Sequence, residues 1–191
     1  MEDKLKEWLA VKVDEERYLH SLRVLELIPE LTQAYNVSPE PLRLAALLHD
    51  CARGMSDAEM LRAAEEWSLP VRPVDRDCPV LLHGRLAVEM ARCELDLTDP
   101  VMVSAVLNHT AGHPGMTLAD KLFFLADMIE PGRGFDRIVE LRAVAYVDAD
   151  RAMLLAIEIN KAHLNAMGRF VDPVTLELQR MLESFTERSN G

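Results

Sequence analysis

Helical periodicity runs along almost the whole chain and constrains the fold more than any other feature. Apolar residues recur at spacings of three and four positions, which is the pattern of amphipathic helices. Stretches that alternate apolar and polar residues, as strands do, are nearly absent. The 191 residues are enough to surround a single core. We therefore expect an all-α fold, a helical bundle in one compact domain.

Start and stop signals divide this pattern into separate helices. Ser38 is a good N-cap with proline behind it, and Ser56 with Glu59 matches a capping box. Pro29 is expected to bend the helix that contains it. The predicted helices cover about residues 14–35, 38–52, 56–67, 80–95, 99–109, 117–130 and 148–167, with a last helix in "VDPVTLELQRMLESF". "LPVRPVDRDCP", "TAGHPGM" and "PGRGFD" are predicted loops.

Charge and composition exclude several classes of function. The formal net charge of −11 argues against a nucleic-acid polymer as partner, since phosphate backbones need broad basic surfaces. A small anionic substrate stays open if metal ions or a few arginines assist. No apolar run is long enough to cross a membrane, and the charged N-terminus is no signal peptide. Cys51, Cys78 and Cys93 form no CxxC pair, which favours a reduced, cytoplasmic protein.

Four of the six histidines lie on the apolar faces of four different predicted helices. They are His20, His49, His83 and His109. His20, for example, shares its face with Val24, because positions four apart lie on the same side of a helix. Asp50 follows His49 directly, and Asp127 comes late in an apolar helix. One core would therefore contain six polar side chains that can bind metal.

A lone histidine on an apolar face is usually a core residue bonded to a carbonyl, and either aspartate alone could cap a loop. Six such groups together must all be satisfied, and a metal ion does this at once. The mixture of imidazole and carboxylate suits iron, manganese, cobalt or zinc better than calcium or magnesium. His49 and Asp50 diverge by about 100° on a regular helix, so they converge on one ion only at a helix end.

The order of His20, His49-Asp50 and Asp127 resembles the HD-domain metal-dependent phosphohydrolases. The surrounding segments "RYLHSLRV", "AALLHDCARG", "LLHGRLA" and "LNHTAGHPGMTLADKLFFLADMIEPGR" are similar to the YqeK-like branch, the symmetrical bis(5′-nucleosyl)-tetraphosphatases. The resemblance covers about residues 17–147. It implies an HD-domain bundle at residues 14–147, preceded by an N-terminal segment at 1–13. Residues 148–191 would form C-terminal helices that pack on the same domain.

The resemblance also implies roles for individual residues. The implied metal ligands are His20, His49, Asp50 and Asp127, with iron as the expected ion. The implied phosphate contacts are His83, His109, Thr110 and Arg133. Arg53 stands where the family often has a lysine, which keeps the charge but changes its geometry. His83 and His109 are also candidates to hold a second metal.

The implied reaction splits diadenosine tetraphosphate into two ADP. A bound metal would supply hydroxide near neutral pH, and Asp50 would orient the attacking water. Arg53 and Arg133 can each donate two parallel hydrogen bonds to phosphate oxygens. His83 or His109 would donate a hydrogen bond, or a proton to the leaving ADP. Asp50, His83 and His109 are therefore the candidate catalytic residues.

Three alternatives stay open at this point. Another HD phosphohydrolase chemistry, on a deoxynucleotide, a guanosine alarmone or a cyclic dinucleotide, would use the same metal motif. A nucleotide sensor would bind without turnover. A purely structural helical dimer would use the histidines for packing, and a homodimer is also compatible with the enzyme. His113, in a loop, and His163, which has no acidic motif nearby, are expected to lie outside the site.

Overall fold

The computed structural model describes residues 1–189, with side chains described as far as Phe185. Within this part of the chain all regular structure is helical, which confirms the predicted all-α class. In chain order the elements are α1 (Glu2–Ala10), α2 (Glu15–Ala34), α3 (Glu40–Leu48), α4 (Asp57–Glu66), α5 (Pro73–Asp77), the short 3-10 helix η1 (Pro79–Leu82), α6 (His83–Leu95), α7 (Pro100–Asn108), α8 (Leu118–Ile129), α9 (Ile138–Ala145), α10 (Ala149–Ala166) and α11 (Pro173–Ser189).

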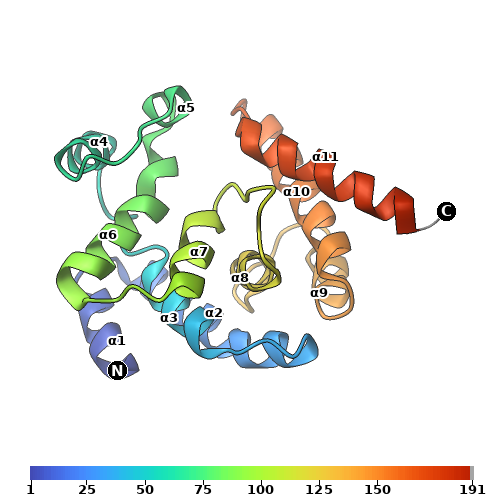
Figure 1. The fold of residues 1–191 in the computed structure, drawn as a ribbon, viewed down its shortest axis with the longest axis horizontal. Coiled ribbons are helices and arrows are strands. Elements are labelled where there is room, and N and C mark those ends of the chain that lie inside the picture. Colours follow the sequence, from blue (N-terminus) through green and yellow to red (C-terminus); the bar gives the residue numbers. More distant parts are fainter. Residues whose placement is uncertain (190–191) are drawn as a thin grey trace.

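Helices α7 and α8 lie at the centre of the molecule (Figure 1). Helices α2 and α3 pack against this centre, with α2 touching α8 and α3 touching both α7 and α8. Helices α1 and α4–α6 lie on one side, and α9–α11 lie on the other (Figure 1). The ends of α2, α3, α6, α7 and α8 are thereby brought to one region, which is where the polar side chains of the core meet.

The central helix α8 illustrates why these segments are helical. Thr117 and Asp120 form a reciprocal capping box at its start. Leu122 and Phe123 are completely buried, and the helix is apolar on most of its surface. Helix α4 begins with the capping box predicted at Ser56 and Glu59. Local capping and burial therefore agree in these elements, as expected for a well-specified fold.

The structure corrects the sequence prediction in three places. Residues 2–10 of the predicted N-terminal segment form α1, which buries Leu5 and Leu9. The loop predicted in "LPVRPVDRDCP" contains α5 and the start of η1, since both begin with proline in the first helical turn. The helix predicted for 38–52 ends at Leu48, and the chain turns from there on. His49 and Asp50 consequently sit at a helix end, as the metal hypothesis requires.

None of the described helices is long and apolar enough to cross a lipid bilayer. The three cysteines are all unpaired, and Cys51 is buried. Burial raises the pKa of the Cys51 thiol far above its usual value, so this residue is an inert part of the core. The domain boundaries at residues 13 and 147 stay a prediction.

A buried carboxylate connects α5 to the start of α11. Asp75 is completely buried, and its oxygens accept hydrogen bonds from Arg72 (Nη2–Oδ1 2.7 Å) and Arg85 (Nη2–Oδ2 2.8 Å). Arg72 also binds Asp172 (Nη2–Oδ2 2.7 Å), directly before α11. Burial alone would raise the pKa of Asp75, but the bonds from Arg72 and Arg85 hold it below its usual value.

We expect Asp75→Asn to lower the free energy of unfolding by about 2 kcal/mol at pH 7, because charge-assisted hydrogen bonds to a buried group are lost. The pKa of Asp75 is lower in the folded than in the unfolded protein. Ionised Asp75 therefore contributes to the free energy of unfolding above about pH 4, and this contribution is lost as the pH falls through the folded-state pKa. Urea unfolding at pH 7 and pH 3 should show the gap between wild type and variant shrinking in acid. A gap that stays constant would contradict this assignment.

Candidate metal centre and active site

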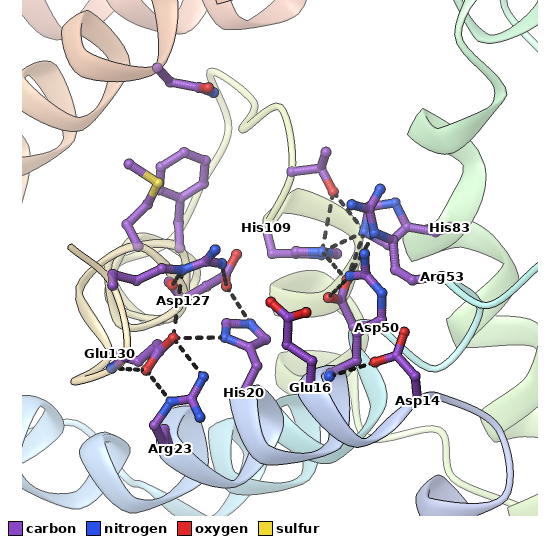
Figure 2. A pocket seen from close by; sticks show the side chains of 17 residues that line it. Asp14, Glu16, His20, Arg23, Asp50, Arg53, His83, His109, Asp127 and Glu130 are labelled. Carbon is purple, nitrogen blue, oxygen red and sulfur yellow. Dashed lines mark hydrogen bonds and ion pairs between the residues drawn. The ribbon is translucent and has the colours of Figure 1, made fainter. Parts of the chain in front are cut away.

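Six side chains that can bind metal meet at one place between the central helices, and Figure 2 shows them apart from the fully buried His49. They are His20 on α2, His49 and Asp50 directly after α3, His83 at the start of α6, His109 directly after α7, and Asp127 near the end of α8. Three sets of three donor atoms each lie within 4.8 Å of one another. The sequence predicted all six as inward-facing, and the fold brings them together.

Three of the four histidines are oriented by the helix turn that precedes them. In each, Nδ1 meets the carbonyl oxygen of the residue three positions earlier, and Nε2 faces the cluster. The pairs are His49 with Ala46 (3.0 Å), His83 with Val80, and His109 with Val106 (2.7 Å). A histidine that ligates a metal commonly donates its other N–H to a carbonyl in this way, which fixes the ring and the tautomer.

His20 is oriented by a carboxylate instead. Its Nδ1 lies 3.2 Å from Oε1 of Glu130, and Oε2 of Glu130 accepts a hydrogen bond from Nε of Arg23 at 2.6 Å. Burial alone would raise the pKa of Glu130, but the bond from Arg23 lowers it below its usual value. Glu130 is therefore a charged partner for the His20 ring. Sequence reasoning missed Glu130, although it lies in the "EPGR" stretch and three residues after Asp127.

Asp50 stands between two groups of histidines. In the first group, His20 Nε2 lies 2.8 Å from Asp127 Oδ1 and 3.3 Å from His49 Nε2. In the second group, His83 Nε2 and His109 Nε2 are 2.8 Å apart. Asp50 Oδ2 is 3.8 Å from His49 Nε2, whereas its Oδ1 is 3.3 Å from His83 Nε2. Each carboxylate oxygen thus faces a different group.

The protonation of His49, His109 and the two aspartates matches that of metal ligands, whereas the pKa of His20 is raised, because its hydrogen bond to Asp127 and the charge of that carboxylate outweigh burial. Burial lowers the pKa of His49, and burial together with the neighbouring His83 lowers that of His109 to about 3. Both rings are neutral near pH 7, which is the form that binds metal. Burial opposes ionisation of Asp50 and Asp127, yet the surrounding histidines hold both carboxyl pKa values below their usual range. Neutral imidazoles beside ionised carboxylates suit a divalent transition metal.

A cavity of about 390 Å³ opens over the cluster, and four guanidinium groups line it. They belong to Arg17, Arg23, Arg53 and Arg133. Arg17 donates to Asp50 (Nη1–Oδ2 3.2 Å), and Arg133 donates to Asp127 (Nη2–Oδ1 3.1 Å). Five carboxylates line the same cavity, so the four guanidinium groups are a local supply of cations in a chain that carries −11 overall. An acidic protein repels an anionic substrate unless cationic groups bind it locally, and these arginines can do so.

The remaining predicted site residues also lie at this cavity. Thr110 Oγ1 is 3.2 Å from Nε2 of both His83 and His109, and Arg53 lines the wall near Asp50. Arg133 is half-exposed and bonded to Asp127 rather than free. His113 and His163 do not line the cavity. Sequence reasoning missed Arg17, Arg23 and Asn160; the two arginines lie three residues either side of His20 and share its helix face.

Arg142 on α9 fixes the segment that carries Glu130 and Arg133. Its guanidinium donates to the carbonyl oxygens of Ile129 (3.0 Å), Glu130 (2.8 Å) and Arg133 (3.1 Å). These carbonyls belong to the last residue of α8 and to residues beyond it, where backbone acceptors have no helical partner. Arg142 therefore satisfies them and holds this wall of the cavity in place.

Fold and site together define an all-helical protein whose helix ends assemble a candidate centre for a divalent metal. The model of the HD domain family matches residues 17–132, a span that contains all six side chains of the cluster. The chain belongs to the HD domain family. It is an enzyme of the hydrolase class within that family, and the resemblance to the tetraphosphatase branch is confirmed by its relatives.

Several known proteins are similar to this chain over most of their length. The symmetrical bis(5′-nucleosyl)-tetraphosphatase of Bacillus subtilis is 29% identical over 86% of this chain and 88% of its own. The protein of the same name from Staphylococcus aureus is 31% identical over 75% of this chain and 74% of its own. A crystal structure from Clostridium acetobutylicum, described as that of a predicted HD superfamily hydrolase involved in NAD metabolism, has a TM-score of 0.92 and 31% identity. The match covers 96% of this chain and 97% of that one.

Proposed function

We propose that this enzyme hydrolyses diadenosine tetraphosphate, and related dinucleoside tetraphosphates, symmetrically to two ADP. One observation carries the proposal: the side chains of the histidine–aspartate cluster other than the buried His49, together with four arginines, face a single cavity. A chain of phosphates is the substrate that needs both a metal centre and several guanidinium groups at once. The names of the similar tetraphosphatases support the particular substrate.

The residues fit one or two divalent ions. His20, His49, Asp50 and Asp127 would hold the first, and the two oxygens of Asp50 favour a second at His83 and His109. Iron is our expected metal, with manganese, cobalt and zinc as the other ions that this donor set suits. When bound, such an ion acts as a Lewis acid and lowers the pKa of a coordinated water.

The side chains around the cluster would bind and orient the phosphates. Arg17 and Arg53 lie beside Asp50, whereas Arg23 and Arg133 lie beside Glu130. A phosphate chain across the cluster would thus meet guanidinium groups on both sides. Arg133 would give up its bond to Asp127 and donate two parallel hydrogen bonds to phosphate oxygens.

Asp50, His83 and His109 would act closest to the reacting phosphorus. Asp50 would accept a hydrogen bond from the attacking water and so orient it. Because the pKa of His109 is lowered to about 3, this ring would serve as a neutral hydrogen-bonding group near pH 7. With only the first ion bound, Nε2 of His83 stays free of metal, and protonation of the leaving ADP would then fall to His83. Thr110, within 3.2 Å of both rings, would complete the contact to a phosphate oxygen.

Product analysis tests the proposed reaction. The protein is incubated with diadenosine tetraphosphate and iron(II) or manganese(II), and the nucleotides are separated by ion exchange. We expect ADP as the sole product, at two per substrate consumed. ATP with AMP would show asymmetric cleavage and overturn the proposal. An absence of turnover would equally overturn it and redirect attention to other HD substrates or to a nucleotide sensor.

We expect His83→Ala and His109→Ala each to reduce kcat by about 10²-fold or more, because general acid catalysis and phosphate contacts are worth at least this much. His163→Ala is the matched control, since His163 is an exposed histidine on α10 away from the cavity. Steady-state assays under metal saturation give the comparison. Full turnover in both cavity variants would disprove the roles assigned to these histidines.

A further inference from the structure

One wall of the cavity differs in chemistry from the rest. Phe124, Asp127 and Met128 lie at positions i, i+3 and i+4 of α8 and share one helix face. Phe124 and Met128 therefore line the same cavity as the metal-binding Asp127. Helix α10 packs against α8 and contributes Asn160 to this lining. These three residues, Phe124, Met128 and Asn160, form what we call the neutral wall.

The rest of the lining is mainly ionisable. It consists of His20, His83 and His109, the four arginines, and the carboxylates of Asp14, Glu16, Asp50, Asp127 and Glu130, with Thr110 and Gly132 between them. The neutral wall has apolar surface and one amide but no charge. The apolar side chains of this wall offer a phosphate no partner, whereas a flat heterocycle with polar edges matches both the apolar surface and the amide.

The amide of Asn160 is free to bind a ligand. The residue is half-buried, and among the described residues its side chain has no hydrogen-bond partner. An amide in a partly desolvated site gains most from a partner that offers one donor and one acceptor side by side. Asn160 also lies beyond the 17–132 span of the HD domain match, so it is an addition to the common metal-binding fold.

We propose that Asn160 selects adenine, which rests on the proposed function of the site as a dinucleotide hydrolase. Its Oδ1 would accept from the N6 amino group while its Nδ2 donates to N7, a pairing that asparagine makes with adenine. Guanine presents two acceptors, O6 and N7, on the same edge, and Oδ1 would then face an acceptor. Phe124 and Met128 supply the apolar surface on which the ring packs.

Equilibrium binding tests this role without turnover. Affinities for ADP and GDP are measured by calorimetry on manganese-loaded wild type, Asn160→Ala and Asn165→Ala. Asn165 is an exposed asparagine on the same helix, which makes it the matched control. We expect wild type and Asn165→Ala to prefer ADP, and Asn160→Ala to bind ADP about tenfold more weakly with GDP affinity unchanged, since one bidentate base contact gives at least this discrimination.

Three binding results would overturn the inference: an unchanged ADP affinity in Asn160→Ala, an equal loss for ADP and GDP, or no nucleotide binding by wild type. Turnover of diadenosine and diguanosine tetraphosphate separates this inference from the proposed function. Wild type that cleaves the adenine substrate with no dependence on Asn160 would disprove base selection alone. If wild type cleaves neither substrate but binds ADP more tightly than GDP, and Asn160→Ala lacks this preference, the proposed reaction is disproved and base selection is supported.

Discussion

Asp50→Ala is expected to abolish turnover and to strip the protein of bound metal in the same step. Asp50 lies between the two histidine groups, with Oδ1 3.3 Å from His83 Nε2 and Oδ2 3.8 Å from His49 Nε2. Its loss removes a carboxylate from both candidate metal positions. Several kcal/mol of charge stabilisation from the metal would be lost, which corresponds to a fall in kcat of about 10³-fold or more.

Metal content by inductively coupled plasma mass spectrometry and kcat are the two measurements for Asp50→Ala. Glu16→Gln is the control, since Glu16 is a carboxylate that lines the cavity but belongs to none of the candidate ligand sets. The control should retain both metal and turnover. An Asp50→Ala protein that keeps its full complement of metal would show that the two histidine groups do not depend on this carboxylate.

Gly84→Ala is expected to lower both the stability and the activity of the enzyme. Gly84 follows His83 on α6, and a Cβ at this position would lie 2.8 Å from the carbonyl oxygen of Val106 and 3.4 Å from Cε1 of His109. A backbone oxygen cannot rotate away, so α6 and α7 would have to separate. Overpacking of this kind costs about 1–3 kcal/mol. The 2.8 Å approach of His83 to His109 would change with it.

Urea unfolding and kcat at saturating metal are the measurements for Gly84→Ala. Gly134→Ala provides the control, because a Cβ there would meet no atom within 4 Å. We expect the control to match wild type in both measurements. If Gly84→Ala also matched wild type, the contact between α6 and α7 would be looser than the structure shows, and the positioning of the second histidine group would need another explanation.

Much of the candidate site could be predicted from local patterns. His20, His49, His83 and His109 each follow the apolar period of their own segment, and this alone indicates that they face inward. The adjacency of His49 and Asp50 predicts a helix end, and α3 does end just before them. Helix length was harder to predict, because apolar residues resume at Cys51 and Ala52, after the backbone has begun to turn beyond Leu48.

The residues that local patterns missed act through long-range contacts. Glu130 reaches His20 across 110 residues of sequence, and Arg142 acts on backbone carbonyls rather than on any motif. Helix α1 contains only two buried leucines, a signal too short to stand out in the sequence. Its place is set by α3, on which it packs, and by the ion pair between Glu2 and Arg43.

The sequence by itself determined the helical class, the inward direction of the four histidines and the identity of the two aspartates. These follow from residue type and the 3.6-residue period, which are local properties of the chain. The tertiary structure alone decided that His20 lies beside His49 and His83 beside His109 with Asp50 in contact with both pairs, and that Asn160 joins the cavity from α10. The physical reason is that the sequence period shows which residues share a helix face, whereas the distance between two such faces is set only when the helices pack.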